Sequence, residues 1–181
     1  MAERGFIILL IGLPAVGKST LSAPLARELG ATILDRDDMT RAIVPPACLT
    51  WTRAQVKLAG EVCARVVETV LREQPWARII IDGFTFSRKV DVDSFVRVAE
   101  RCGCDIYRIE CVADEAVVRR RIEGDAEGLA KRRDWSMYTG VRDRFEPLEW
   151  VDLRVDLTEK DVGPECARVV EYIRQRQRKE G

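Results

Sequence analysis

The feature that most constrains this chain is a nine-residue glycine loop, Gly12–Thr20, which reads Gly-Leu-Pro-Ala-Val-Gly-Lys-Ser-Thr. It matches the pattern G-x-x-x-x-G-K-[ST], and it stands between an apolar run, Phe6–Ile11, and a helical pattern, Leu21–Leu29. Its two glycines allow backbone conformations that residues with a Cβ avoid, so successive N–H groups can turn toward phosphate oxygens. The alternative is a glycine turn with a solvated lysine, but the flanking strand and helix patterns favour phosphate binding.

Two side chains of this loop have expected roles of their own. Lys18 supplies a mobile positive charge for the β- and γ-phosphates, and Ser19 supplies a hydroxyl ligand for Mg²⁺. The helix that follows adds the positive end of its dipole and unpaired N–H donors. The sequence therefore predicts that the chain binds a nucleoside triphosphate. The expected contacts are Gly12, Leu13, Pro14, Ala15, Val16, Gly17, Lys18, Ser19 and Thr20.

Strand and helix patterns alternate along the chain, which predicts an α/β fold with a parallel sheet in a three-layer P-loop NTPase domain. We expect residues 1–181 to form one domain. Five strands are expected, at 6–11, 31–34, 78–81, 105–112 and 151–157. Helices are expected at 21–29, 39–44, 52–73, 90–102, 114–123, 138–145 and 164–177. In such sheets, ligands bind beyond the carboxyl ends of the strands.

Aspartates follow the second expected strand. A carboxylate at Asp37 or Asp38 could accept the proton of a substrate hydroxyl, and Arg41 could hold the acceptor or steady the carboxylate. The alternative role is helix N-capping, which needs only one of the three aspartates in this stretch. Both spacings to Arg41 lie on one helix face, so the residues alone leave the choice between Asp37 and Asp38 open.

The third expected strand ends in Asp82, which is placed to hold Mg²⁺ through water, although an Asp-Gly pair can also simply form a turn. The next residues, Phe84–Arg88, carry aromatic, hydroxyl and basic side chains at the same edge of the sheet. They either pack the loop or line an acceptor pocket. The candidates for acceptor contact are Phe84 and Arg88.

Arginines flank a polar, glycine-containing segment that follows the fourth strand. Arg119–Arg121 precede it and Arg132–Arg133 lie within it. An arginine delivered by a closing lid would stabilise charge on a transferring phosphoryl group and expel water. The alternative is a solvated helix face, and three consecutive arginines cannot all point the same way. We expect a lid at approximately residues 119–138.

With these motifs, the sequence resembles the small AAA-type P-loop kinases grouped with zeta toxins, chloramphenicol phosphotransferase and polynucleotide 5′-kinase. The resemblance implies Asp37 as the base, Arg41 as an acceptor contact, and Arg121 with Arg133 as lid arginines. A D-x-x-R spacing in that group would instead select Asp38. The resemblance rests on Gly12–Thr20, Arg36-Asp37-Asp38 with Arg41, Ile79–Gly83, the helix holding Arg121, Ser136 and Phe145-Glu146-Pro147.

The amino-acid composition limits which groups can act as acids, bases or metal ligands, and which partners are expected. There is no histidine, so any acid–base work falls to carboxylates or lysine, and the six cysteines lack a zinc-site spacing and are expected to be reduced thiols. Lysine plus arginine and aspartate plus glutamate number 30 each, which argues weakly against broad binding to nucleic acid or membranes. No apolar run has the length of a transmembrane helix, and no signal-peptide pattern opens the chain, so a cytoplasmic location is expected.

The leading hypothesis is therefore a kinase that uses ATP and Mg²⁺ to phosphorylate a hydroxyl of a small molecule, such as a nucleoside-like metabolite, a sugar or an antibiotic. A polynucleotide 5′-hydroxyl kinase is an alternative, disfavoured by the neutral charge. The Asp82-Gly-Phe84 stretch also allows a nucleoside monophosphate kinase. From a different class, the chain could be a nucleotide-dependent switch or an ATPase without an acceptor.

Overall fold

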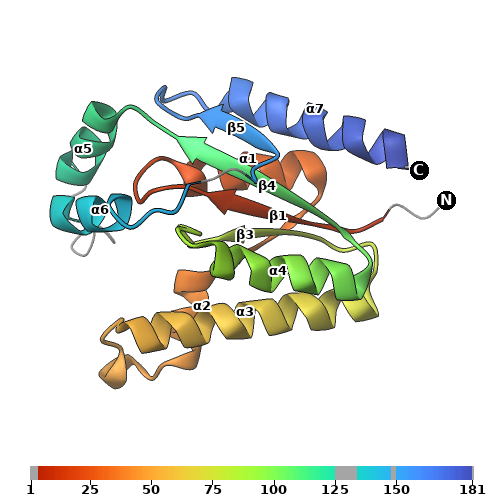
Figure 1. The fold of residues 1–181 in the computed structure, drawn as a ribbon, viewed down its shortest axis with the longest axis horizontal. Helices are drawn as coiled ribbons and strands as arrows, with labels where there is room; N and C mark the ends of the chain where they lie inside the picture. The colour runs from red at the N-terminus through yellow and green to blue at the C-terminus, as the bar shows by residue number, and fades with distance from the viewer. Residues whose placement is uncertain (1–3, 125–133, 148–149, 181) are drawn as a thin grey trace.

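Five parallel strands form one sheet in the computed structural model, which describes residues 4–124, 134–147 and 150–180. Their order is β2-β3-β1-β4-β5, and each neighbouring pair is parallel (Figure 1). The bounds are β1 Phe6–Ile11, β2 Thr32–Asp35, β3 Arg78–Asp82, β4 Asp105–Val112 and β5 Leu153–Asp156. The glycine loop thus leaves the central strand, in the middle of the carboxyl edge.

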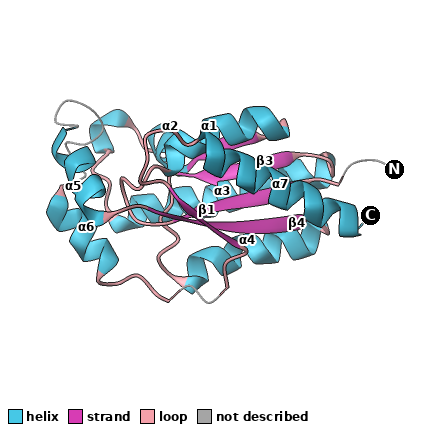
Figure 2. Ribbon diagram, turned by 90° about the horizontal axis from the view of Figure 1, so that it is seen from above, coloured by secondary structure: helices cyan, strands magenta, loops and turns pink. Residues whose placement is uncertain are grey.

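Helices cover both faces of this sheet. The bounds are α1 Lys18–Leu29, α2 Arg36–Ile43, the 3-10 helix η1 Pro46–Cys48, α3 Arg53–Glu73, α4 Lys89–Cys102, α5 Glu115–Gly124, α6 Trp135–Arg142 and α7 Gly163–Glu180. Side chains of α1 and α7 share one buried cluster, and those of α3 and α4 share the other. Figures 1 and 2 show the resulting layers, which confirm the predicted three-layer α/β fold.

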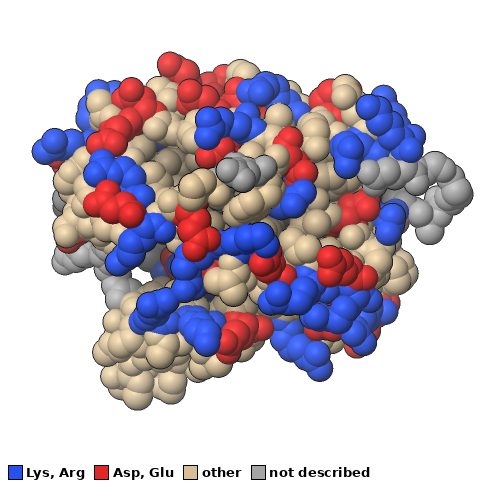
Figure 3. All heavy atoms as spheres, in the orientation of Figure 1, with Lys and Arg blue, Asp and Glu red and all other residues tan. Residues whose placement is uncertain are grey.

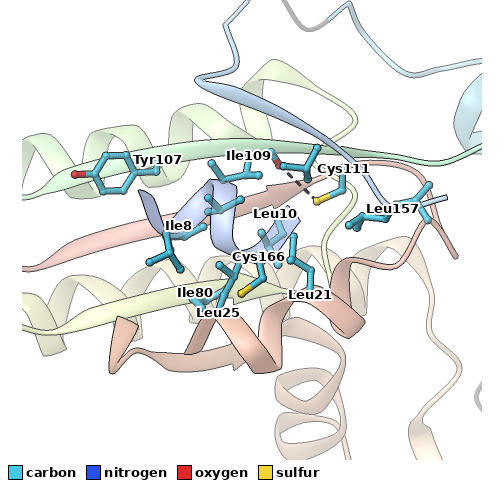
Figure 4. Close-up of a cluster of buried hydrophobic side chains, with 14 of the residues drawn as sticks. Ile8, Leu10, Leu21, Leu25, Ile80, Tyr107, Ile109, Cys111, Leu157 and Cys166 are labelled. Atoms are coloured by element: carbon cyan, nitrogen blue, oxygen red, sulfur yellow. Dashed lines mark hydrogen bonds between the residues drawn. The ribbon is translucent and has the colours of Figure 1, made fainter. Parts of the chain in front are cut away.

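The central strand explains why the sheet is covered on both sides. All six side chains of β1 are fully buried, and they alternate between the two clusters. Ile8 and Leu10 pack with Leu21 of α1, as Figure 4 shows, whereas Ile7 and Leu9 pack with residues of α3 and α4. A continuous apolar run is the pattern of a strand buried on both faces.

Three helices, α1, α2 and α6, begin three residues earlier than expected, and aspartate caps explain the starts of α2 and α6. The expected start of α2 was Met39, but the helix begins at Arg36, because the Asp35 side chain accepts hydrogen bonds from the backbone N–H groups of Asp37 and Asp38. Likewise α6 begins at Trp135, because the Asp134 carboxylate accepts a 2.6 Å bond from the Met137 N–H. A side-chain oxygen at the N-cap satisfies a donor that the helix itself cannot.

The surface carries charges of both signs. Figure 3 shows lysine and arginine side chains interspersed with acidic ones over the face seen in Figure 1. Over the parts of the chain that the structure describes, no helix combines the length and the apolarity needed to cross a membrane.

Candidate active site

The glycine loop adopts backbone conformations that its sequence anticipates. Gly12 has a φ of +150°, and a Cβ there would collide with the Cys111 carbonyl oxygen. Gly17, at +111°, is the N-cap of α1 and leaves the first turn without a side-chain cap. Ala15 also has a positive φ, +61°, which is uncommon for a residue with a Cβ. Strained backbone conformations are common at ligand-binding sites. The backbone N–H groups at the uncapped start of α1 can donate hydrogen bonds to an anion.

Lys18 lies over this loop. Its Nζ donates to the Gly12 and Leu13 carbonyl oxygens, both at 2.8 Å, and the residue is buried. The ammonium group is thereby held against the backbone that is expected to surround the phosphates.

A cavity of about 930 Å³ opens beside the loop. Figure 3 shows the molecule hollowed at its left edge, where Figure 1 places α5 and α6 above the start of α3. The predicted site residues that line it are Pro14, Ala15, Gly17, Lys18, Ser19, Thr20, Asp37, Arg41, Asp82, Phe84 and Arg121. Those that lie outside its lining are Gly12, Leu13, Val16, Asp38 and Arg88.

Asp35 takes the capping role among the aspartates that follow β2. Its Oδ1 accepts from the backbone N–H of Asp37 at 2.7 Å and of Asp38 at 3.0 Å. Burial raises the pKa of the Asp35 carboxyl, and the nearby Asp37 and Asp82 carboxylates raise it further against the effect of the backbone bonds. Because one aspartate suffices for the cap, Asp37 and Asp38 remain available for other roles.

The two remaining aspartates differ in environment. Asp37 lines the cavity, its side chain is 21% exposed, and it is paired with Arg36 at 2.9 Å. The Asp38 side chain is 78% exposed and is paired with Arg41 at 2.6 Å. A general base must reach a bound hydroxyl. The geometry therefore favours Asp37 over Asp38 for that role.

Asp82 is fixed at the floor of the cavity. It is buried, its Oδ2 accepts from the Ser22 hydroxyl at 2.9 Å, and its Oδ1 accepts from the Gly83 N–H at 2.7 Å. Gly83 has a φ of +76°, and a Cβ there would come within 2.9 Å of the Arg36 nitrogen. The glycine thus lets the end of β3 approach the start of α2, which brings Asp82 near Asp35.

Magnesium chemistry fits the donors at this point. Ser19 and Asp82 both line the cavity, and a hydroxyl with a carboxylate is a donor pair that Mg²⁺ accepts alongside phosphate oxygens and water. Within the described residues, no group of three or more histidine, cysteine, aspartate or glutamate side chains gathers to hold a metal. A magnesium ion here would depend on the nucleotide for its other ligands.

Of the two predicted acceptor contacts after β3, Phe84 lines the cavity and Arg88 does not. Phe84 lines the cavity with its ring stacked on Phe86 at 4.7 Å, and the Arg36 guanidinium lies 5.0 Å from its centre. Arg88 instead pairs with Asp91 at 2.8 Å at the start of α4. The structure therefore does not bring Arg88 to the cavity, because the helix that follows supplies a carboxylate one turn away.

Arg121 joins two elements rather than projecting freely. Its guanidinium donates to the Val16 carbonyl at 3.0 Å, and to the Leu157 and Thr158 carbonyls at 2.7 and 3.1 Å. Arg119 turns elsewhere, toward Glu123 at 2.8 Å. Arg119 and Arg121 thus point in different directions. The predicted lid arginine Arg133, with residues 125–133 of the proposed lid at 119–138, lies outside the described residues.

Other residues that line the cavity were not predicted from the sequence as site residues. Trp51 stands out, since it is a large residue with a φ of +57° that belongs to no recognised motif. The further lining residues are Arg36, Thr50, Trp51, Val56, Gly83, Val117, Ile122, Met137, Leu157, Thr158, Glu159, Lys160 and Val162.

Comparison with known proteins places this geometry in a wider group. A family model described as an AAA domain matches residues 7–138, more than half of the chain. None of the curated proteins matches.

Several solved structures have the same fold. A protein of Chloroflexus aurantiacus J-10-fl, provisionally named a kinase, is 23% identical with a TM-score of 0.74, over 99% of each chain. The Mycobacterium tuberculosis APS kinase CysC, in complex with AMPPNP and APS, is 20% identical with a TM-score of 0.71, over 95% of this chain and 99% of that one. A sugar kinase of Janibacter sp. HTCC2649 is 14% identical with a TM-score of 0.64, over 94% of each chain. The fold is therefore that of P-loop kinases.

Proposed function

This chain belongs to the AAA domain family that its residues 7–138 match, and from that premise we propose that it is a magnesium-dependent kinase that transfers the γ-phosphate of ATP to a hydroxyl of a small molecule. The observation that carries the proposal is that Asp37 and Lys18 line one cavity. A carboxylate on the acceptor side and an ammonium on the phosphate side are the charges that phosphoryl transfer to an alcohol requires.

In the proposed reaction, the glycine loop and the first turn of α1 hold the triphosphate, with Lys18 on its β- and γ-phosphates. Asp37 accepts the proton of the acceptor hydroxyl while the oxygen forms a bond to the γ-phosphorus. The bond from that phosphorus to the bridging β,γ-oxygen breaks, and ADP leaves with the electron pair. Ser19 and Asp82 would hold the magnesium ion, directly or through water, and the metal neutralises charge on the phosphates.

Two arginines complete the proposal. Arg36, bonded to Asp37, orients the base, and Arg41 contacts the acceptor. Arg121 holds the glycine loop beside the loop that follows β5, where the nucleoside of ATP would lie. We also propose that residues 1–181 form a single kinase domain. Within it, Arg133 is the proposed lid arginine.

The fold leaves the acceptor open, because the similar structures include an APS kinase and a sugar kinase, whose names specify different acceptors. The mixed charges in Figure 3 favour a small molecule over a polynucleotide. Steeply salt-dependent acceptor binding would instead favour the polynucleotide.

The test is a screen for acceptor-dependent release of ADP, using nucleosides, nucleoside monophosphates, sugars, antibiotics and oligonucleotides. Once an acceptor is found, Asp37→Asn should lower kcat by about 10²- to 10⁴-fold and leave ATP binding intact. Asp38→Asn is the matched comparison and should retain kcat, with any effect confined to the acceptor KM, since its exposed side chain lies outside the cavity lining and pairs with Arg41. ATP hydrolysis that no acceptor stimulates would contradict the kinase, and full activity in both variants would contradict the base.

A further inference from the structure

Trp51 occupies a strained position beside the proposed base. It lies in the short connection between η1 and α3, and its φ of +57° is a left-handed conformation that bulky residues rarely adopt. Such a conformation is strained and persists only where the surroundings impose it. The chain therefore places its largest kind of side chain here at a cost.

One side chain imposes this conformation. Gln55, in the first turn of α3, accepts with its Oε1 from the Trp51 N–H at 2.7 Å and from the Thr50 N–H at 3.1 Å. Its Nε2 donates to the Cys48 carbonyl oxygen at 2.8 Å. Three backbone groups of the connection are thus tied to one amide. Gln55 is a positioning residue for Trp51.

The indole ring is placed close to the acceptor side of the cavity. The Arg41 guanidinium lies 5.2 Å from the centre of the Trp51 ring, and Asp38 orients that guanidinium through a 2.6 Å ion pair. Arg41 is one helical turn beyond Asp37 on α2, and Trp51, Arg41 and Asp37 all line the same cavity. The indole and the proposed base therefore face one volume.

The rest of this wall is uncharged. Thr50 and Val56 line the cavity beside Trp51, and Figure 3 shows the projection at the lower left, where Figure 1 places η1 and the start of α3, as almost free of charged side chains. Beside Arg41, a wall of one large aromatic ring and two uncharged side chains suits a flat apolar face better than a polyol, whose hydroxyl groups need hydrogen-bond partners.

We propose that Trp51 is the stacking surface of the acceptor subsite, and that the acceptor carries a flat unsaturated ring next to its reacting hydroxyl. The proposal rests on the kinase function above and specifies its substrate class. The ring lies against the indole, Arg41 contacts its polar edge, and the hydroxyl points toward Asp37. Nucleosides and aromatic alcohols belong to this class, whereas sugars without a base do not.

The experiment compares ring-bearing and ring-free acceptors with the whole chain. The four ribonucleosides and chloramphenicol serve as ring-bearing probes, and methyl β-D-ribofuranoside and glycerol as ring-free ones. Binding is measured by calorimetry in the presence of a non-hydrolysable ATP analogue, and transfer by release of ADP. At least one ring-bearing probe should bind and be phosphorylated with a lower KM than any ring-free probe.

Variants separate stacking from structure. Trp51→Ala should raise the acceptor Kd and KM about tenfold, with the KM for ATP unchanged, and Trp51→Phe should restore most of the loss. Trp51→Gly should show the same acceptor defect while melting no lower than the parent, because glycine adopts a positive φ without strain. Gln55→Ala should show an intermediate defect. Trp76→Ala is the matched control, since that tryptophan is 60% exposed and lines a different cavity.

The outcomes distinguish this proposal from the kinase itself. A ring-bearing probe that binds through Trp51 but is not phosphorylated would support the acceptor subsite and count against the kinase. Phosphorylation of ring-free probes with equal efficiency, unaffected by Trp51→Ala, would overturn the subsite and leave the kinase standing. If no ring-bearing probe binds at millimolar concentration, the stacking proposal is wrong.

Discussion

Among single residues, Arg121 has the contacts that most need a functional test. Its guanidinium bonds the carbonyl of Val16 in the glycine loop and those of Leu157 and Thr158 after β5. A planar fork of donors can span two elements in this way, whereas the single ammonium of lysine cannot. We therefore interpret Arg121 as holding the two halves of the proposed ATP site, for the phosphates and for the nucleoside, at a fixed spacing.

Replacing Arg121 with alanine should raise the KM for ATP roughly tenfold and leave the KM for the acceptor nearly unchanged, because hydrogen bonds from a charged donor are lost on the nucleotide side alone. Arg121→Lys should resemble Arg121→Ala. Steady-state kinetics would measure both. Arg119→Ala is the control, since that side chain pairs with Glu123 and lies outside the cavity lining. An unchanged KM for ATP in Arg121→Ala would show that the three bonds are incidental.

Two buried cysteines and one half-buried cysteine allow a prediction about pH. Burial raises the pKa of the Cys63 and Cys104 thiols to about 11 and of the Cys111 thiol to about 12. Since the thiolate is the nucleophile, iodoacetamide at pH 8 should label exposed Cys48 and spare these three, as read by mass spectrometry.

The same shifts have a consequence for stability. Above the ordinary thiol pKa of 9.0, the unfolded chain releases protons that the folded chain still holds, so the free energy of unfolding should fall as pH rises from about 9 to 11. Urea unfolding across that range measures the decline. The control variant is Cys63→Ala, because Cys63→Ser would bury a hydroxyl. Cys63→Ala should weaken the decline of the free energy of unfolding with pH. If the free energy of unfolding of Cys63→Ala falls with pH as steeply as that of the parent, the Cys63 thiol does not contribute to the decline.

Residue types could be predicted better than residue roles. The loop pattern identified Lys18 and Ser19 because phosphate binding needs those groups at that spacing. The choice between Asp37 and Asp38 could not be made, because it depends on where α2 begins, and only the cap at Asp35 fixes that register. Trp51 was not anticipated, since its position depends on the Gln55 amide and on a backbone conformation that no short pattern encodes.

At the scale of elements, the start of α2 couples stability to catalysis. Asp35 caps this helix, and Asp37 and Arg41 lie on it. The Asp35 pKa is raised, so the folded chain holds that proton more tightly than the unfolded chain does. Ionisation of Asp35 therefore costs stability, and the cost grows as pH rises above the ordinary carboxyl pKa of 3.8.

Two substitutions separate the cap from its charge. Asp35→Asn keeps a capping oxygen and removes the buried charge, so its stability relative to the parent should improve as pH rises from about 4 to 7. Asp35→Ala removes the cap and should cost about 1 kcal/mol, with a fall in kcat because Asp37 is displaced. Urea unfolding at several pH values, with kinetics at neutral pH, measures both. An asparagine variant as unstable as the alanine variant would rule out this account of the cap.

Most elements could be predicted because their patterns are local. The apolar run of β1 gave its bounds without error, and the amphipathic pattern placed α3 within one residue at its start. The errors lie where a side chain outside the pattern decides the boundary, as Asp134 does for α6. The short η1 helix was missed because a single turn has too few residues to show a period.

For the whole molecule, strand order is the property that the sequence left open. Alternating strands and helices predicted a parallel sheet, but the order β2-β3-β1-β4-β5 depends on which strands pair, and these contacts join residues far apart in the chain. That order puts β1 at the centre and β3 beside it. The glycine loop and Asp82 therefore meet at one edge, and the candidate site is a product of the topology as much as of its motifs.

Binding of a triphosphate at that edge should stabilise the whole domain. A ligand that binds only the folded chain at a hundred times its Kd adds about 2.7 kcal/mol to the free energy of unfolding. For a domain of this size, that corresponds to a rise of roughly 5–10 °C in melting temperature. A non-hydrolysable ATP analogue with Mg²⁺ should produce this rise in a thermal melt, and the rise should shrink when EDTA removes the metal that Ser19 and Asp82 are proposed to hold.

Lys18→Ala should remove most of that rise, because the ammonium group is the charge that the loop adds to its backbone donors. Lys57→Ala is the matched control, since its Nζ pairs with Glu61 on the surface of α3 and its side chain is 73% exposed. The free variants should melt close to the parent, so that a lost rise reports lost binding and not lost structure. If the analogue fails to stabilise the parent, or stabilises Lys18→Ala equally, the glycine loop does not bind a triphosphate. In that case Asp37, Arg121 and Trp51 would have no nucleotide beside them to act on.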